Sequence, residues 1–413
     1  MDLREIQRVD PEVAEYMERE IERQTTTIDL CASANRASKA VLNASGSIFS
    51  DKPSEGYPDR RYHGGCQNID AIEKIGIERA KRIFNCDHVN LQPHSGTNAN
   101  LAIFFGFLEP GATVLSMSLT HGGHLSHGFS SNISGKFYRA ISYHTNSETE
   151  LIDFKEVEDL SFREKPKMII AGATSYPRQI DFRRFKEIAD KVGAYLLADI
   201  AHIGGLIAGG VHPSPFPWCD FAVVTNYKTL PGSRGGMILC KKEHASTVDR
   251  AVFPGIQGGM IASLTTAKTV ALKECFSPSF KEFQKYIVLN AKALANALKM
   301  RGYRLVTGGT DVHMMIVDLS DKAISGLDAQ RSLEQSGITV DKNLIPNDSR
   351  SSMVTSGIRI GTQCITSQGM RETQMDTIAG FIDETLRNIS NTTIHSDVRK
   401  RVAELCGCFK LDR

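Results

Sequence analysis

The stretch AYLLADIAHIGGLIAGGVHPSPFPWCDFAVVTNYK, residues 194–228, contains two short apolar strands and two charged residues that follow them closely. The first strand ends at Asp199, the second leads to Lys228, and a glycine-rich turn follows each. Strands that read as continuous apolar runs are typical of a parallel sheet covered by helices on both faces. Because ligands of such sheets bind beyond the carboxyl ends of the strands, we expect Asp199 and Lys228 to lie at a binding site.

Further apolar segments on both sides of this stretch alternate with amphipathic helices. Apolar residues at helical spacing predict a helix over 69–84 and a crossover helix over 182–192. Strands of this part are expected near 89–92, 113–117, 137–142, 167–172, 194–198 and 220–225. The alternation predicts an α/β fold with a mostly parallel sheet in a large domain.

After helical segments near 261–300, the pattern changes to that of a smaller α+β domain. Its strands are expected near 303–306, 312–318, 337–341 and 357–360, and its helices over 327–336 and 371–389. At the other end of the chain, residues 10–24 are predicted to form an amphipathic helix with Pro11 in its first turn. We therefore expect an N-terminal helical arm over 1–27, a cofactor-binding large domain over 28–272 and a C-terminal small domain over 273–413.

Composition limits the class of protein. Hydrophobic residues make up 41% and charged residues 23% of the 413 residues, which is ordinary for a globular protein. Lysine and arginine exceed aspartate and glutamate by 49 to 47, so neither a nucleic-acid surface nor an anionic-membrane surface is expected. The acidic N-terminal segment lacks the apolar core of a signal peptide, and the nine cysteines form no paired framework. We expect a cytoplasmic protein with reduced thiols.

Pyridoxal phosphate chemistry needs the residue types found after the two strands. A lysine forms a Schiff base with the aldehyde of this cofactor, and a carboxylate keeps the pyridine nitrogen protonated so that the ring accepts electrons. Either residue alone is more typical of a surface charge at a strand end, but the two together favour the cofactor. We predict that Lys228 holds pyridoxal phosphate and that Asp199 pairs with its ring nitrogen.

The segment NLQPHSGTNANLAIFF, residues 90–105, provides a cradle for the cofactor phosphate. It reads as a strand followed by Ser95, Gly96 and Thr97, and then by a helix that opens at Asn98. Backbone N–H groups and hydroxyls at a helix N-terminus bind phosphate well. An ordinary helix N-cap is the alternative, and a nucleotide-binding P-loop is not, because no Gly-Lys-Ser/Thr follows.

Two other motifs concern the substrate and a metal. Arg359 lies in VTSGIRIGT, residues 354–362, and its planar fork suits the carboxylate of an amino acid, with a surface ion pair as the alternative. His121, His124 and His127 in HGGHLSH suggest a metal, but the motif has no Cys, Asp or Glu ligand. We favour no metal, with one imidazole stacked on an aromatic cofactor.

Seven motifs, in chain order, carry a family resemblance. They are EGYPDRRYHGGC (55–66), LQPHSGTNAN (91–100), THGGHLSHG (120–128), ADIAHIGGLIAGGVHPSP (198–215), YKTLPGSRGG (227–236), FPGIQGG (253–259) and VTSGIRIGT (354–362). Together they resemble the serine hydroxymethyltransferases over residues 28–370. The resemblance implies a fold-type I pyridoxal phosphate enzyme, a homodimer or dimer of dimers with shared active sites. It also implies the conversion of serine and tetrahydrofolate to glycine and methylenetetrahydrofolate.

Carried over position by position, the resemblance assigns roles to matching residues. Lys228 is the Schiff-base lysine, Glu55 from the partner subunit is an acid–base group that contacts the substrate, and Ser33 and Arg359 bind the substrate carboxylate. The other catalytic candidates are His63, Tyr62 and Tyr227. The cofactor-binding candidates are Ser95, Gly96, Thr97, His124 (stacked on the ring), Thr174 and His202 (near the phenolic oxygen), Asp199 and Thr225, with Gly258 and Gly259 from the neighbouring chain. The possible folate-binding residues are Leu119, Gly123, Leu125 and Asn343.

Four segments depart from the family pattern. The family's Tyr-Ala-Glu-Gly-Tyr is PSEGY at 53–57, its Arg-Tyr-Tyr-Gly-Gly is RYHGG at 61–65, its Ala-Ser-Glu-Asn is ASAN at 32–35, and its His-Lys-Thr is YKT at 227–229. The imidazole that replaces the second tyrosine carries protons near neutral pH, whereas a phenol with a pKa near 10 does not.

Three hypotheses follow from these changes. The first is a serine hydroxymethyltransferase proper. The second is a relative with an altered reaction, such as a folate-independent aldolase or transaldolase, or a hydroxymethyltransferase that acts on an α-substituted amino acid such as α-methylserine. The third, a non-catalytic partner subunit, is disfavoured by the intact Lys228, Asp199 and Arg359.

Overall fold

The computed structural model describes residues 3–409, and seven strands of this range form the largest sheet. Six of them run parallel to one another, and β10 runs antiparallel between β4 and β9. In their order across the sheet, the strands are β4 (His88–Asn90), β10 (Gly236–Cys240), β9 (Phe221–Thr225), β8 (Tyr195–Asp199), β7 (Met168–Gly172), β5 (Thr113–Met117) and β6 (Arg139–Tyr143). The sequence predicted all of these strands except β10.

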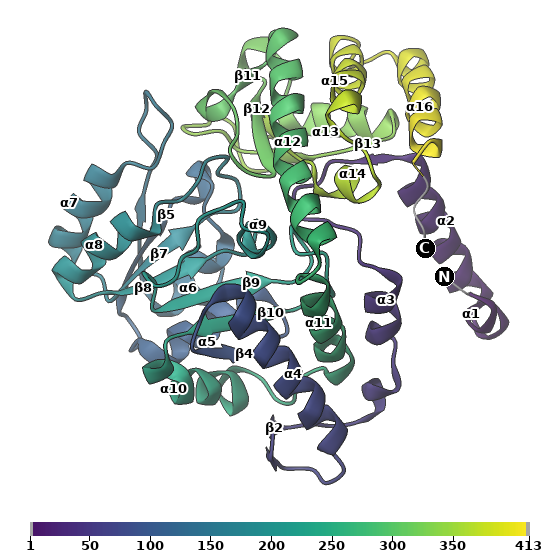
Figure 1. Cartoon of the computed structure of the whole chain (residues 1–413). Helices are drawn as coiled ribbons and strands as arrows, with labels where there is room; N and C mark the ends of the chain where they lie inside the picture. Colours follow the sequence, from purple (N-terminus) through teal and green to yellow (C-terminus); the bar gives the residue numbers. More distant parts are fainter. Residues whose placement is uncertain (1–2, 410–413) are drawn as a thin grey trace.

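Helices cover both faces of this sheet, on the lower left of Figure 1. They include α4 (Gln67–Phe84), α5 (Gly96–Phe107), α6 (Ile133–Phe137), α7 (Phe154–Glu164), α8 (Phe182–Val192), α9 (Gly204–Ala208), α10 (Ala245–Arg250) and α11 (Ala262–Glu274). In β7, Ile169 and Ala171 belong to the core under α4, α7, α8 and α11, whereas Met168 and Ile170 belong to the core under α5 and α10. Because both faces are buried, these strands read as continuous apolar runs.

A smaller antiparallel sheet of four described strands lies above the first sheet in Figure 1. Its order is β11 (Arg304–Leu305), β12 (Met314–Asp318), β15 (Gly357–Gly361) and β14 (Asp341–Asn343). It packs with α13 (Gly326–Gln335), α14 (Gln363–Ser367), α15 (Glu372–Arg387) and α16 (Thr392–Gly407). In its register, Arg359 of β15 lies between Ile316 and Asp341 on the neighbouring strands.

The long helix α12 (Pro278–Met300) connects the two parts of the molecule. Phe280 and Ile287 pack in the core of the large sheet, whereas Leu294 and Leu298 pack in the core of the small sheet. The N-terminal segment also joins the second core, because β1 (Ile28–Asp29) pairs with β13 (Ile338–Thr339). The division of the chain at residues 27/28 and 272/273 stays a prediction, but Ile28 packs with the C-terminal core.

The N-terminal arm is two helices rather than one, α1 (Arg4–Val9) and α2 (Pro11–Thr26). Asp10 separates them, and its side chain accepts a hydrogen bond from the backbone N–H of Val13 as the N-cap of α2. Figure 1 shows the arm descending beside α16 and away from the large sheet. Val13 and Tyr16, on its predicted apolar face, are exposed.

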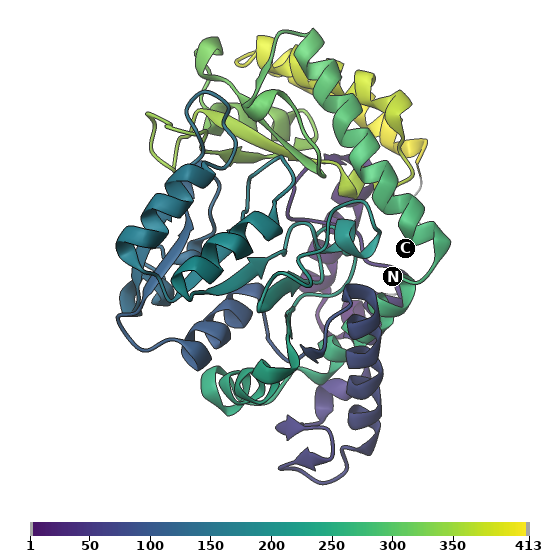
Figure 2. The same cartoon turned by 60° about the vertical axis from the view of Figure 1, so that its left-hand side comes forward.

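A loop-rich segment precedes α4 and contains α3 (Lys39–Ser45) and a hairpin of β2 (Gly56–Tyr57) and β3 (Arg60–Arg61). Figure 2 shows this hairpin projecting from the lower end of the molecule, beside one end of α4. The projecting hairpin contains the motif EGYPDRRYHGGC and therefore carries Glu55 and His63.

Candidate functional site

A cavity of about 60 Å³ lies at the carboxyl ends of β8 and β9. The predicted cofactor residues of this chain gather around it, together with four residues that the sequence did not single out for this role: Asn100, His127, Ala173 and Ala201. The lining residues are Ser95, Gly96, Thr97, Asn100, His124, His127, Ala173, Thr174, Asp199, Ala201, His202, Thr225, Tyr227 and Lys228.

Lys228 is the buried amine of this cavity, with 7% of its surface exposed. Burial lowers the pKa of Lys228 to about 8, against the opposing effect of the Asp199 carboxylate. Within residues 3–409, no hydrogen-bond or ion-pair partner lies within reach of its Nζ. The backbone of Lys228 is held in place by Asn35, whose Nδ2 donates to the Lys228 carbonyl at 2.5 Å. A neutral fraction of such an amine exists near pH 7 and is free to act as a nucleophile.

A second buried lysine, Lys268, differs from Lys228 because its side-chain nitrogen donates hydrogen bonds to three backbone carbonyls. Its Nζ donates to the carbonyls of Leu91, Pro93 and Gly236 at 2.7, 3.1 and 2.9 Å. These three acceptors satisfy an ammonium group, so Lys268 holds the ends of β4 and β10 together. It is therefore a structural residue.

Asp199 is a buried carboxylate held by two side chains. Its Oδ2 accepts hydrogen bonds from Asn100 Nδ2 and His127 Nε2, each at 2.8 Å. Burial alone would raise the pKa of Asp199, but the bonds from His127 and Asn100 outweigh burial and keep that pKa well below its usual range. The carboxylate therefore stays ionised and suits a protonated ring nitrogen.

The N-terminus of α5 faces the same cavity. Ser95 is the N-cap, because its Oγ accepts from the backbone N–H of Asn98 at 3.1 Å. Across the described range, the backbone N–H groups of Gly96 and Thr97 donate to no protein acceptor. A Cβ on Gly96 would lie 2.7 Å from Thr225 Cγ2, so only glycine leaves this approach open. Two free N–H groups at the positive end of a helix fit a phosphate.

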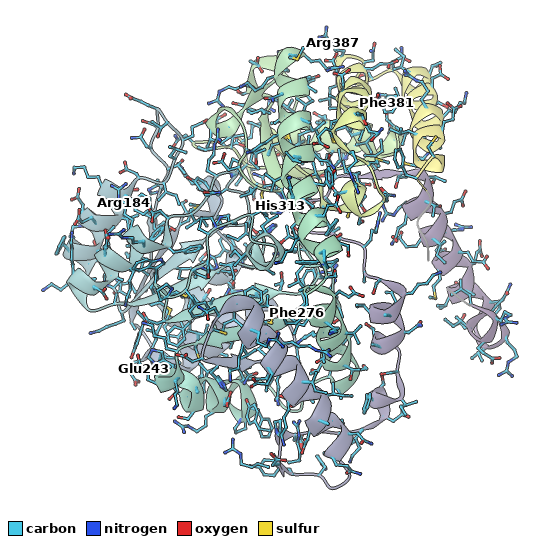
Figure 3. All side chains as sticks on the ribbon, viewed as in Figure 1. Arg184, Glu243, Phe276, His313, Phe381 and Arg387 are labelled. Carbon is cyan, nitrogen blue, oxygen red and sulfur yellow. The ribbon has the colours of Figure 1, made fainter. Side chains whose placement is uncertain are left out.

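Two imidazoles line the cavity in neutral form. Burial lowers the pKa of His124 to about 4, with a smaller contribution from His127. Burial also lowers the pKa of His202 well below its usual value. His202 lies between Thr174, whose Oγ1 is 3.4 Å from its Nε2, and the buried His313, whose Nε2 is 3.3 Å from its Nδ1. Figure 3 shows His313 near the middle of the molecule, below the small sheet.

The three histidines of HGGHLSH have separate partners. His121 Nδ1 bonds to Thr145, His124 Nδ1 to Ser126, and His127 Nε2 to Asp199. Among the residues that the structure describes, no group of three or more His, Cys, Asp or Glu side chains is arranged to hold a metal ion. The sequence did not predict the role of His127, because its hydrogen-bond partner Asp199 lies 72 positions away in the sequence.

Arg359 lies where the two sheets approach each other and donates hydrogen bonds to both parts. Its Nη1 donates to the carbonyl of Thr174 at 2.7 Å, and its Nη2 donates to Ser33 Oγ at 2.9 Å. Its guanidinium also pairs with Asp341, which the sequence did not single out. Ser33 and Arg359 are thus brought together, next to Thr174 of the cavity wall.

Glu55, His63, Gly258 and Gly259 are not part of the cavity wall. They form a second cluster, in which His63 Nε2 lies 2.8 Å from Glu55 Oε2 and a Cβ on Gly259 would lie 3.1 Å from Glu55 Cγ. The side chains of His63 and Glu55 are 38% and 43% exposed. Tyr62 is more exposed still and contacts the ring of Phe253 edge-on. These residues therefore present an open surface.

Arg61 fixes the backbone on both sides of Glu55. Its Nη1 donates to the carbonyls of Ser54 at 2.9 Å and Gly56 at 2.6 Å. Its other nitrogens pair with Asp70 and Glu73 of α4. The side chain of Arg61 is 3% exposed, so the loop that carries Glu55 is anchored by a buried ion-pair network.

Tyr227 and the predicted folate-binding residues complete the set of predicted site residues. Tyr227 lines the cavity, with the guanidinium of Arg234 4.2 Å from the centre of its ring. Leu119, Gly123 and Leu125 belong to one loop, and His121 of this loop interacts with Asn347, which lies close to Asn343 in sequence. The predicted folate residues therefore come from the loop after β5 and from the end of β14.

These observations fit pyridoxal phosphate. The cavity combines an unengaged buried amine, an ionised buried carboxylate and a helix N-terminus with two free N–H groups. Lys228 would take the aldehyde, Asp199 the ring nitrogen, and Gly96 and Thr97 the phosphate.

The comparison with protein families gives the same result. A sequence model described as serine hydroxymethyltransferase matches residues 6–382 of the 413 residues. Its members are fold-type I pyridoxal phosphate enzymes, so the predicted resemblance, fold class and enzyme class are confirmed. In the described part of the chain, no helix has the length and apolar character needed to cross a membrane. The chain belongs to the serine hydroxymethyltransferase family, a family of pyridoxal-phosphate-dependent transferases.

Proposed function

We propose that this enzyme transfers a hydroxymethyl group between the α-carbon of a small amino acid, serine by preference, and tetrahydrofolate. The observation that carries the proposal is the unengaged, buried Lys228 in one cavity with Asp199 and the N-terminus of α5. When bound there, pyridoxal phosphate supplies an electron sink for the pair of electrons released at the substrate α-carbon. The protein supplies orientation, charge and proton transfer.

Each group in the cavity has a distinct task. Lys228 would bind the aldehyde of the cofactor, and its Nζ would hold or release a proton when the substrate amine takes its place. Asp199, kept ionised by Asn100 and His127, holds a proton on the ring nitrogen. Arg359 and Ser33 bind the substrate carboxylate beside Thr174. Because burial keeps His124 neutral, its ring can lie against the cofactor without adding a positive charge.

A homodimer completes the site in this proposal. Glu55 and His63 are half-exposed and lie outside the cavity of their own chain, next to Gly258 and Gly259. We infer that this cluster enters the cavity of a second copy, where Glu55 exchanges a proton with the substrate hydroxyl. The loop that contains Leu125 and the end of β14 at Asn343 would then receive the pterin of tetrahydrofolate.

The test of this proposal is a product assay with purified enzyme. With L-serine and tetrahydrofolate, glycine and methylenetetrahydrofolate should form in equal amounts, and the reaction should stop when folate is left out. A cleavage rate that is indifferent to folate would contradict the proposal.

A second candidate function is supported by the contact between His63 and Glu55. A hydrogen bond of 2.8 Å couples the two side chains and places an imidazole beside the carboxylate, at a position where the family resemblance places tyrosine. That coupling suits an aldolase, a transaldolase or a hydroxymethyltransferase for an α-substituted substrate such as α-methylserine.

The two candidates differ in substrate profile. Turnover of α-methylserine or threonine above that of serine would favour the second candidate. His63→Tyr should then shift the preference toward serine, and an unchanged profile would exclude His63 as the cause.

A further inference from the structure

The N–H groups of Arg359 donate hydrogen bonds to three residues, Asp341, Thr174 and Ser33. Its Nε and Nη2 both donate to Oδ2 of Asp341, at 3.2 and 2.6 Å. Its Nη1/Nη2 end contacts Thr174 and Ser33 on the side of the cavity wall. The Nε/Nη2 edge is therefore already neutralised by a carboxylate of the protein. The Nη1/Nη2 end contacts only neutral groups of the described chain, and a ligand carboxylate at this end would share it with Thr174 and Ser33.

The pair of Arg359 and Asp341 is built into the small sheet. The two residues are direct cross-strand neighbours in the antiparallel pair β14–β15, so their side chains lie on the same face. Arg359 is 7% exposed, and the Asp341 side chain is 31% exposed. The other oxygen of Asp341, Oδ1, accepts from the thiol of Cys31 at 3.3 Å. Asp341 is thus held from two sides, by Arg359 and by Cys31.

We propose that Asp341 is a positioning residue that aims Arg359 at the cavity and, through its negative charge, limits how tightly the enzyme binds the carboxylate of its amino-acid substrate. The inference rests on the proposed function, because it takes Arg359 as the carboxylate-binding residue. A ligand carboxylate at the Nη1/Nη2 end and the Asp341 carboxylate would share one guanidinium, so they repel each other across it. Weak ground-state binding favours turnover and release of the small product.

The critical variant removes the charge and keeps the shape. Asparagine at this position retains an oxygen that can accept from Nε and Nη2, whereas glutamate retains the charge. Two carboxylates that share one guanidinium, in the effective dielectric of a half-buried site, repel enough to change affinity about tenfold. Loss of structure weakens binding, so tighter binding after a substitution is a signature that structural damage cannot produce.

The experiment is calorimetric titration of the holoenzyme with glycine and with L-serine. Asp341→Asn should lower the Kd for both ligands about tenfold, and Asp341→Glu should not lower it. Asp341→Ser is measured alongside as a second neutral replacement, which should also lower the Kd, so that a misfolded asparagine variant still leaves a result. Asp376→Asn is the matched control, because Asp376 pairs with Arg301 at 2.7 Å on the exposed side of α15. This control should bind both ligands as the wild type does.

The possible outcomes distinguish a failure of the role of Asp341 from a failure of the proposed function. Neutral variants that bind no more tightly than the wild type, or a glutamate variant as tight as the asparagine variant, would overturn the role of Asp341. A wild-type enzyme that binds neither glycine nor serine would overturn the proposed function itself, and this inference with it.

Discussion

Replacing Arg61 by methionine should destabilise the protein and displace Glu55, because one buried guanidinium anchors the loop that carries this glutamate. Methionine keeps the apolar stem of the side chain and removes its five N–H donors. The lost bonds run to the carbonyls of Ser54 and Gly56, to Asp70 and to Glu73.

The cost is set mainly by Glu73, whose side chain is 1% exposed. Burial raises the pKa of Glu73 even with Arg61 beside it, and without Arg61 only Gln92 would remain as its hydrogen-bond partner. Breaking a buried pair by removing one member costs about 3–5 kcal/mol. The same substitution in the exposed pair of Arg8 and Glu5 should cost less than about 1 kcal/mol.

Urea unfolding followed by circular dichroism gives these free energies. The double variant Arg61→Met with Glu73→Gln should be about 2 kcal/mol more stable than the sum of the single changes predicts, because glutamine needs no counter-ion. In the folded Arg61→Met variant, kcat should fall more than amino-acid affinity, since Glu55 is misplaced while Arg359 is untouched. A loss of stability no larger than that of Arg8→Met would refute the anchoring role.

Three other perturbations follow from the site. Gly96→Ala should weaken cofactor binding about tenfold in titrations of the apoenzyme, because its Cβ would lie 2.7 Å from Thr225 Cγ2. Gly407→Ala is the control, since a Cβ there would have no neighbouring atom within 4 Å. Equal cofactor affinities of the two variants would contradict the phosphate-binding role of Gly96. Burial lowers the pKa of His124 to about 4 and of His313 to about 3, so the unfolded chain takes up protons below pH 6.5 that the folded chain does not. These two groups should therefore lower stability by about 2.5 kcal/mol between pH 7 and 5.5, in addition to the loss from the buried His202. His313→Asn should remove about 1.2 kcal/mol of the total in urea titrations, and a pH slope unchanged by this substitution would contradict the neutral burial of His313. Arg359→Ala should raise the amino-acid KM about 100-fold in steady-state assays, because a buried carboxylate partner is lost, and an unchanged KM would exclude Arg359 from substrate binding.

Local signals were enough to predict several elements of the fold. The helix predicted over 182–192 has the same bounds as α8, because both of its ends are fixed by neighbouring residues. Asp181 caps its start through a hydrogen bond to the N–H of Arg184, and Gly193 ends it with a φ of 66°. The strands of the large sheet were visible because both of their faces are buried. Where caps and burial patterns are encoded locally, the sequence is informative.

Elements and contacts that depend on residues distant in the sequence were harder to predict from the sequence. β10 was not predicted, since the four apolar residues 237–240 after a glycine-rich loop carry no sign of an antiparallel insertion between β4 and β9. Asn100 and Asp341 were missed because their partners, Asp199 and Arg359, become neighbours only through the packing of α5 and the register of β14. A search for polar residues one helical turn after the phosphate cradle would have found Asn100.

The central claim is that Lys228 carries the cofactor. Borohydride reduction of the purified enzyme fixes a Schiff-base cofactor on its lysine, and peptide mass mapping then identifies that residue. The reduced group should be found on Lys228, and Lys228→Ala should abolish both the label and the visible absorbance. A label on Lys268 or on any other lysine, or no label in protein supplied with pyridoxal phosphate, would contradict the account.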